Sequence, residues 1–401
     1  MPRPLHLTLG LGLLALGHAA AAPIQVSFWH SMESASALVQ RLADDFNKSQ
    51  SSYQVVPTSV GNYRDAEAKL QEAIKAGKPP TLFQAELSTF PGLVAAGQVV
   101  SLNGFEKTLA PDFVGDFYPA VWNYGEVAGA RYGLPWNVST PVLYYNAGAL
   151  KRAGVGAPRT WADVEAAAAK LSGRGRRGLL ITNDSWSFEQ LVDARGGSVV
   201  KDGKPNFTSP EVVAALDSLA RLSSSRAAQP RSLDEATRAA LDFVRGANLM
   251  AVASIANWTD FQKYTVFFEL GAAPMPCDKT CAVPFGGAEL VVLKGASPQA
   301  QVGAQAFWQY LMRPEVLNSW VRETSYMTPR KSVQARLADY YAQNPYRQAA
   351  FAQLDRAVPR PKAPQYAVWQ KYLEEAILRA IQGQASAAQA LADAQKKALG
   401  Q

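Results

Sequence analysis

Histidine and cysteine are scarce in this chain, and their scarcity excludes several kinds of catalytic and metal site. The sequence of 401 residues holds three histidines and two cysteines. Two of the histidines, His6 and His18, lie in the N-terminal segment, which leaves His30. A zinc site with several histidine ligands is therefore excluded, and a Ser-His-Asp triad would have to use His30. We expect neither a metal nor a cofactor.

Familiar enzyme motifs and dense blocks of one charge are missing as well. The sequence contains no G-x-S-x-G, Walker A or H-E-x-x-H motif and no G-x-G-x-x-G after a predicted strand. The glycines and arginines of 173–178 are read as a solvated loop between a helix and a strand. The basic residues outnumber the acidic ones by 40 to 33 but are spread along the chain, so we expect no nucleic-acid binding.

The one long apolar run lies at the N-terminus and has the three-part pattern of a secretory signal peptide. Arg3 precedes an apolar stretch at 5–17, and four alanines follow at 19–22. The stretch is too short to anchor the chain across a bilayer, and no cysteine follows it for lipid attachment. We predict a signal peptide over residues 1–22, cleaved near Ala21 or Ala22, and a soluble, exported protein.

The two cysteines fit an oxidising compartment. Cys277 and Cys281 are separated by three residues, and nearby thiols in an exported protein most often form a disulfide. A metal pair would lack further cysteine or histidine ligands, and a redox pair usually has C-x-x-C spacing. We therefore favour a structural disulfide, whose small loop limits its stabilising effect.

Strands and helices alternate from the start of the mature chain. Residues 24–29, 53–57 and 81–85 have the β-favouring composition of strands, and 33–47 and 65–76 have the apolar spacing of amphipathic helices. This alternation predicts an α/β fold with a parallel sheet covered by helices.

The same alternation continues, with a mostly helical C-terminal third. Further strands are predicted at 141–146, 179–182, 248–254 and 289–293, and helices at 366–381 and 386–399. Thr160 and Asp163 have the spacing of a capping box at the start of another helix. Because the chain has no long linker, we expect two lobes joined by several short crossings.

Aromatic, hydroxyl and acidic side chains lie at the ends of several predicted strands. They are Tyr63, Glu86, Ser139, Trp186 and Ser254. In open α/β sheets, ligands bind beyond the carboxyl ends of the strands. Each residue alone could instead be a core or rim aromatic, a surface acid, a helix cap or a turn. Together they predict a cleft for a polyol or sugar, since hydroxyls and a carboxylate bind OH groups and aromatic rings stack on C–H surfaces.

Several segments in the same order resemble one protein family. The segments are FWHSME at 28–33, GNY at 61–63, NVSTPVLYYN at 137–146, MAVAS at 250–254, GG at 286–287 and TSY at 324–326. Over nearly the full mature length the chain resembles the solute-binding proteins of ABC importers, in the group that includes maltose-binding proteins. Its likeness is greatest to the periplasmic glycerol-3-phosphate-binding proteins of Ugp-type importers.

The resemblance implies a fold, a partner and a location. The fold would be the two-lobed Venus-flytrap architecture with hinge crossings. The N-terminal lobe would hold 23–138 plus 286–323, and the C-terminal lobe 139–285 plus 324–401. Such a protein is a periplasmic monomer without enzyme activity, and it delivers a small-molecule ligand to inner-membrane permease subunits and their ATPase.

The resemblance also implies roles for individual residues. Tyr63 and Tyr326 match ligand tyrosines of the family, and Glu86 matches its glycerol-binding glutamate. Ser139 and Ser254 match the binding serines. Trp186 would form an aromatic wall, and Gly287 would offer a backbone N–H.

One departure from the family concerns the ligand's charge. The family has an arginine that pairs with phosphate just after a Pro-Gln pair, whereas here Trp369 or a neighbour stands at that spacing after Pro364 and Gln365. Losing that contact would cost about 1.5–3 kcal/mol of phosphate binding, unless Arg330 or Arg360 replaces it. The ligand could then be glycerol-3-phosphate, a glycerophosphodiester or an uncharged sugar. A secreted glycoside or phosphodiester hydrolase is the alternative from another class.

Overall fold

A computed structural model describes residues 22–401 of the chain. The predicted signal peptide therefore lies outside the described residues, except for Ala22. Among the helices that are described, none has the length and apolar character that a bilayer-spanning segment needs.

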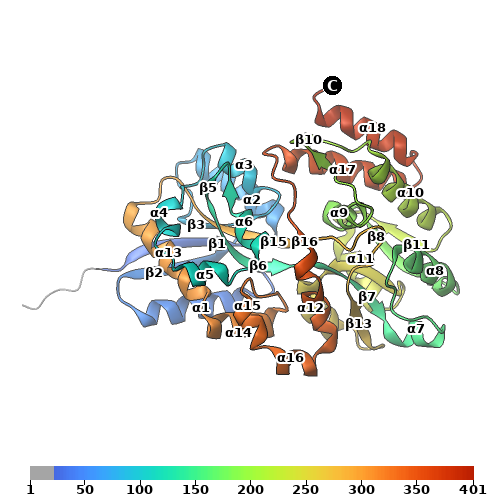
Figure 1. Ribbon diagram of the computed structural model, residues 1–401, viewed down its shortest axis with the longest axis horizontal. Coiled ribbons are helices and arrows are strands. Elements are labelled where there is room, and N and C mark those ends of the chain that lie inside the picture. Colours follow the sequence, from blue (N-terminus) through green and yellow to red (C-terminus); the bar gives the residue numbers. More distant parts are fainter. Residues whose placement is uncertain (1–21) are drawn as a thin grey trace, which may run out of the picture.

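Two five-stranded sheets form the centres of two lobes, which lie side by side in Figure 1. The first sheet has the order β2 (Tyr53–Ser59), β1 (Ile24–His30), β3 (Leu82–Glu86), β15 (Gly286–Val292), β6 (Gly133–Ser139). The second has the order β11 (Ala228–Arg231), β8 (Leu179–Thr182), β12 (Met250–Ser254), β7 (Pro141–Asn146), β13 (Leu270–Ala273). Both are mixed sheets. β1 pairs in parallel with β2 and β3, as the strand–helix alternation predicts, whereas β15 is antiparallel to both of its neighbours.

Helices cover both sheets, and three short two-stranded pairs lie outside the two main sheets. The helices near the first sheet are α1 (Ser36–Ser49), α2 (Tyr63–Lys75), α3 (Phe90–Ala95), α4 (Asn103–Glu106), α5 (Pro111–Gly115), α6 (Pro119–Tyr124), α13 (Pro298–Leu311), α14 (Pro314–Thr324) and α15 (Lys331–Ala335). Those near the second are α7 (Ala147–Arg152), α8 (Trp161–Leu171), α9 (Ser185–Ala194), α10 (Pro210–Ser224), α11 (Ala236–Val244), α12 (Trp258–Tyr264), α17 (Tyr366–Ile381) and α18 (Ala387–Ala398). The remaining elements are α16 (Ala338–Gln343), η1 (Leu233–Glu235), η2 (Ile255–Asn257), η3 (Pro345–Ala349), η4 (Phe351–Arg356) and the pairs β4 (Glu126–Val127) with β5 (Ala130–Arg131), β9 (Val200–Lys201) with β10 (Lys204–Pro205) and β14 (Val283–Pro284) with β16 (Ala357–Val358).

Local sequence signals explain where several helices begin. The capping box predicted at Thr160 and Asp163 is present at the start of α8. α2 begins at Tyr63, whereas the sequence predicted a start at residue 65. The earlier start follows from the Asn62 side chain, which accepts the backbone N–H groups of Arg64 and Asp65. Such a cap satisfies donors that the helix itself cannot. Tyr63 is therefore fixed in the first turn of a helix and does not lie in a loop.

The chain passes between the two sheets more than once. β6 leads directly into β7, and β14 leads through Phe285 back into β15. Later the chain leaves α15, where Lys331 still donates its N–H to the Asp116 carbonyl, and reaches η3, where the Tyr346 hydroxyl donates to Glu269. Short crossings of this kind form a hinge that lets two lobes rotate against each other.

The contacts of residues 327–332 bear on the predicted lobe boundary after residue 323. The Met327 N–H donates to the Val138 carbonyl, and Arg330 Nε lies 2.8 Å from Asp116 Oδ2. Both partners belong to the part of the chain assigned to the N-terminal lobe. We therefore propose that this lobe continues through α15 and that the crossing follows it.

Cys277 and Cys281 form a disulfide, as predicted. The bridge closes a small loop beside the start of α8. There the backbone of Cys277 accepts the Trp161 N–H and donates its own N–H to the Arg159 carbonyl. The disulfide therefore fixes the approach of this loop to the helix.

Mass spectrometry of the exported protein tests the disulfide. Reduction should add one hydrogen to each of the two sulfurs. Replacing Cys277 and Cys281 together by serine should lower the free energy of unfolding by about 2 kcal/mol, because the closed loop is short. Urea denaturation measures that loss, and free thiols in protein purified without reductant would contradict the assignment.

Candidate ligand-binding cleft

A cleft of about 1010 Å³ lies between the two lobes, at the upper limit of the usual size range of small-molecule sites. Of the eight residues predicted for the site, seven line it: Tyr63, Glu86, Ser139, Trp186, Ser254, Gly287 and Tyr326. Five of them end or follow a strand of one of the two sheets. The carboxyl-end rule therefore explains why residues so far apart in the chain meet in one place.

Buried amides hold the tyrosines of the first lobe. Asn137 Nδ2 donates to the Tyr63 hydroxyl over 2.9 Å, and Gln84 Nε2 donates to Asn137 Oδ1 over 2.9 Å. Gln84 in turn accepts the backbone N–H of Ser31. Burial raises the pKa of Tyr63 and of Tyr326 above the usual tyrosine value. Both phenols are therefore neutral at physiological pH and can donate hydrogen bonds to a ligand.

Two consecutive glycines shape the wall of the cleft. A Cβ atom on Gly286 would stand 2.6 Å from the ring of Trp186, and one on Gly287 would stand 1.7 Å from the Asn137 carbonyl oxygen. Gly287 also has a φ of +122°, which side chains rarely tolerate. Trp186 Nε1 donates to the Pro284 carbonyl over 3.2 Å, which fixes the ring against the crossing strand. The wall requires glycine at both positions.

Strand register brings the two serines to the same crossing. Ser139 at the end of β6 pairs with Gly286, and Ser254 at the end of β12 pairs with Pro141. Ser254 also caps η2, since its Oγ accepts the Ala256 N–H over 3.2 Å. The hydroxyl hydrogen of Ser254 remains available to donate to a ligand.

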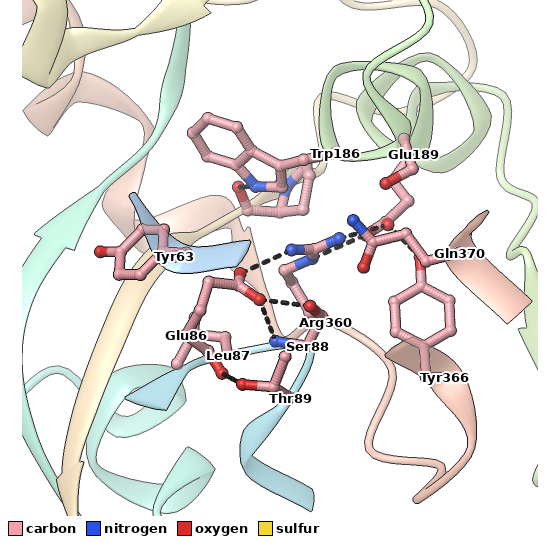
Figure 2. Close-up of polar contacts among 12 residues, drawn as sticks. Tyr63, Glu86, Leu87, Ser88, Thr89, Trp186, Glu189, Arg360, Tyr366 and Gln370 are labelled. Atoms are coloured by element: carbon pink, nitrogen blue, oxygen red, sulfur yellow. Dashed lines mark hydrogen bonds and ion pairs between the residues drawn. The ribbon is translucent and has the colours of Figure 1, made fainter. Parts of the chain in front are cut away.

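An ion-pair network crosses the cleft from one lobe to the other (Figure 2). Glu86 Oε1 lies 2.8 Å from Nη1 of Arg360, and Glu86 Oε2 accepts the Ser88 N–H over 2.7 Å. On its other side Arg360 binds Glu189 with two N–H groups, at 3.2 Å from Nε and 2.8 Å from Nη2. The Tyr366 hydroxyl donates to the same carboxylate. Glu86 is thus oriented by protein groups before any ligand arrives.

Sequence reasoning left Arg360 unplaced and did not single out Glu189. Glu189 lies inside α9, and Arg360 follows only the two-residue strand β16, so their pairing depends on the path of the chain after β16. Arg330, the other candidate for a phosphate charge, pairs with Asp116 and does not line the cleft.

Trp369 is the predicted site residue that does not reach the cleft. Its side chain packs in the hydrophobic core of the second lobe with Tyr366, Leu373 and Ile377, and it is only 8% exposed. The next residue, Gln370, lines the cleft instead. The helical period could have shown this, because Ala367, Gln370, Lys371 and Glu374 share the opposite face of α17.

His30 is the one histidine among the described residues, and its surroundings give it a structural role. His30 is buried, its Nδ1 accepts the Met32 N–H, and burial lowers its pKa to about 4. It is therefore a neutral structural side chain. Within residues 22–401 there is no cluster of three or more histidine, cysteine, aspartate or glutamate side chains arranged for a metal ion.

With this fold and cleft, the chain belongs to the family of bacterial extracellular solute-binding proteins, whose model matches residues 41–349. It is a solute-binding protein of an ABC importer. The sn-glycerol-3-phosphate-binding periplasmic protein UgpB of Shigella dysenteriae is 29% identical to it over 386 residues, covering 90% of this chain and 87% of that protein. UgpB of Escherichia coli K12 is likewise 29% identical over 386 residues, with the same coverage.

Solved structures confirm the two-lobed architecture. UgpB from Mycobacterium tuberculosis in complex with glycerophosphocholine matches with a TM-score of 0.84 at 23% identity, covering 95% of this chain and 98% of that one. The GacH receptor of Streptomyces glaucescens, solved unliganded and with acarbose, matches with a TM-score of 0.83 at 24% identity, covering 94% and 99%.

Two tryptophan variants test the assignment of the cleft wall. Trp186→Ala should weaken ligand binding by about 1–3 kcal/mol, because it removes a stacking surface. Trp369→Ala should instead lower the free energy of unfolding by about 3–5 kcal/mol, because it opens a cavity in the core. Calorimetric titration and thermal unfolding of both variants measure the two effects. A large loss of affinity in folded Trp369→Ala would contradict its placement outside the site.

Proposed function

We propose that this chain is the periplasmic receptor that captures sn-glycerol-3-phosphate or a glycerophosphodiester for an ABC importer. The observation that carries the proposal is the convergence of Tyr63, Glu86, Ser139, Trp186, Ser254 and Tyr326 in one interlobe cleft. The glycerol part of such a ligand offers hydroxyls to Glu86 and the serines and a C–H surface to Trp186. Relatives that are 28–29% identical carry the name of glycerol-3-phosphate-binding proteins, which agrees with this ligand class.

Closure of the two lobes would convert binding into a signal for the importer. A ligand that touches both lobes favours the closed state by its extra contacts there. The closed receptor then docks on the permease subunits, and their ATPase drives transport. We propose that the receptor acts as a monomer in the periplasm after cleavage of its signal peptide near Ala21 or Ala22.

A sugar is the second candidate ligand, and one observation favours it. The family's phosphate-binding arginine has no counterpart on the cleft-facing side of α17, where Gln370 stands and donates to Glu374 over 3.1 Å. An amide suits a neutral hydroxyl-rich ligand as well as a phosphate. Two solved structures of similar fold contain cycloalternan and maltose, respectively.

A thermal-shift screen tests the receptor function directly. Glycerol-3-phosphate, glycerophosphocholine and maltose should be compared, since a ligand that binds only the native state raises the melting temperature. At a concentration of about 100 times Kd, the stabilisation should be about 2.7 kcal/mol. A turnover assay with the ligand that binds distinguishes a receptor from a hydrolase. Sustained release of product would contradict the receptor proposal.

Replacing Gln370 tests which ligand class the cleft holds. If the ligand contains a phosphate, Gln370→Arg should tighten it by about 1.5–3 kcal/mol through a charge-assisted hydrogen bond. If the ligand is an uncharged sugar, the same change should not tighten it. Titration calorimetry measures both outcomes, with Gln370→Lys as a control for added charge without the planar guanidinium. An unchanged affinity of Gln370→Arg for a ligand that contains a phosphate would contradict the position of Gln370 in the site.

A further inference from the structure

Arg360 is the one buried arginine among the residues that line the cleft. Its guanidinium group is paired with two carboxylates. Its side chain is 4% exposed, and it lies between Glu86 on the cleft side and Glu189 on the far side. The edge formed by Nε and Nη2 is used by Glu189, and Nη1 is used by Glu86 (Figure 2). One positive and two negative formal charges leave this group with a net negative charge.

The rest of the described cleft lining does not restore a positive charge. Eight carboxylate residues line it against three cationic ones, and the cations are Arg64, Arg360 and Lys371. Arg64 is paired with Glu374 at 2.6 Å. Lys371 lies at the exposed rim, as do the carboxylates of Glu33, Asp234 and Glu323, and water and salt screen all four charges. The less exposed part of the lining therefore holds five carboxylates, those of Glu67, Glu86, Asp184, Asp260 and Glu374, against Arg360.

A phosphate monoester would enter this cleft at a cost in electrostatic free energy. Such a group carries a charge of about −1.5 to −2 at neutral pH. To bind Arg360 it would have to compete with Glu86 and Glu189, which already supply the charge-assisted hydrogen bonds that a guanidinium can make. A ligand with zero net charge meets no such repulsion.

We propose that Glu189 determines the charge of the ligand from behind the cleft wall. By neutralising Arg360, it makes the cleft select hydroxyl-rich ligands of zero net charge, such as a zwitterionic glycerophosphodiester or an uncharged polyol, over a phosphate monoester. Glu189 does not line the cleft, so it acts through Arg360 as a positioning residue. This inference rests on the receptor function proposed above and narrows its ligand class.

Titration calorimetry of the mature protein and of Glu189→Gln tests the proposal. The probes are glycerophosphocholine, glycerol-3-phosphate and maltose. The wild-type protein should bind a neutral probe about tenfold or more tightly than glycerol-3-phosphate. Glu189→Gln keeps the hydrogen-bonding shape but removes one negative charge, so it should shift the affinity ratio toward glycerol-3-phosphate by about fivefold or more. Added salt should narrow the wild-type preference, because it screens the repulsion between the acidic cleft and glycerol-3-phosphate.

Asp116→Asn is the matched control. It removes one carboxylate from a mostly buried arginine pair, at 2.8 Å from Arg330, and neither residue lines the cleft. It should leave the affinity ratio unchanged. An equal shift in Asp116→Asn would mean that the effect is structural, and the role of Glu189 would be wrong.

The outcomes separate this inference from the proposed function. A wild-type preference for glycerol-3-phosphate over both neutral probes overturns the inference and supports the function, and this result needs no folded variant. A ratio unchanged in folded Glu189→Gln also overturns the inference. Binding of maltose alone contradicts the proposed glycerol-containing ligand but supports the inference that the cleft selects ligands of zero net charge. Binding of none of the three probes contradicts the proposed function and the inference with it.

Discussion

The close contact of two crossing strands organises this protein. Gly287 on β15 approaches the Asn137 carbonyl on β6 so tightly that a side chain would collide with it. The same pairing sets Ser139 opposite Gly286, where the ring of Trp186 rests. Because both strands continue toward the second lobe at this point, the backbone contact fixes the hinge and one wall of the cleft together.

Buried polar groups on either side of that contact are kept in pairs. Within the first lobe, Gln84 donates to Asn137 and Asn137 donates to Tyr63. Between the lobes, Arg360 joins Glu86 of the first lobe to Glu189 of the second. Removing one member of such a buried pair is costly, because it leaves a desolvated polar or charged partner behind. The cleft is therefore lined by oriented groups even without a ligand, which reduces the entropy lost on binding.

The electrostatic character of the cleft distinguishes it from a general anion site. The carboxylates of the lining outnumber its cations, and the arginine that is placed deepest is neutralised from both sides. Hydroxyl donors, aromatic faces and an oriented carboxylate remain for recognition. These groups suit hydroxyls and C–H surfaces, which agrees with the hydroxyl-rich ligand of zero net charge that we propose.

The sequence by itself determined the α/β class, the disulfide and most of the cleft, because strand composition, cysteine spacing and strand-end positions are local signals. The family resemblance located Gly287 and Tyr326 as well. The helical period places Trp369 on the apolar face of α17 with Tyr366 and Leu373, but only the tertiary structure showed that the opposite face meets the cleft. The tertiary structure alone placed Arg360 between Glu86 and Glu189. Those three residues are far apart in the chain, and no local pattern encodes a pairing that depends on how the lobes meet.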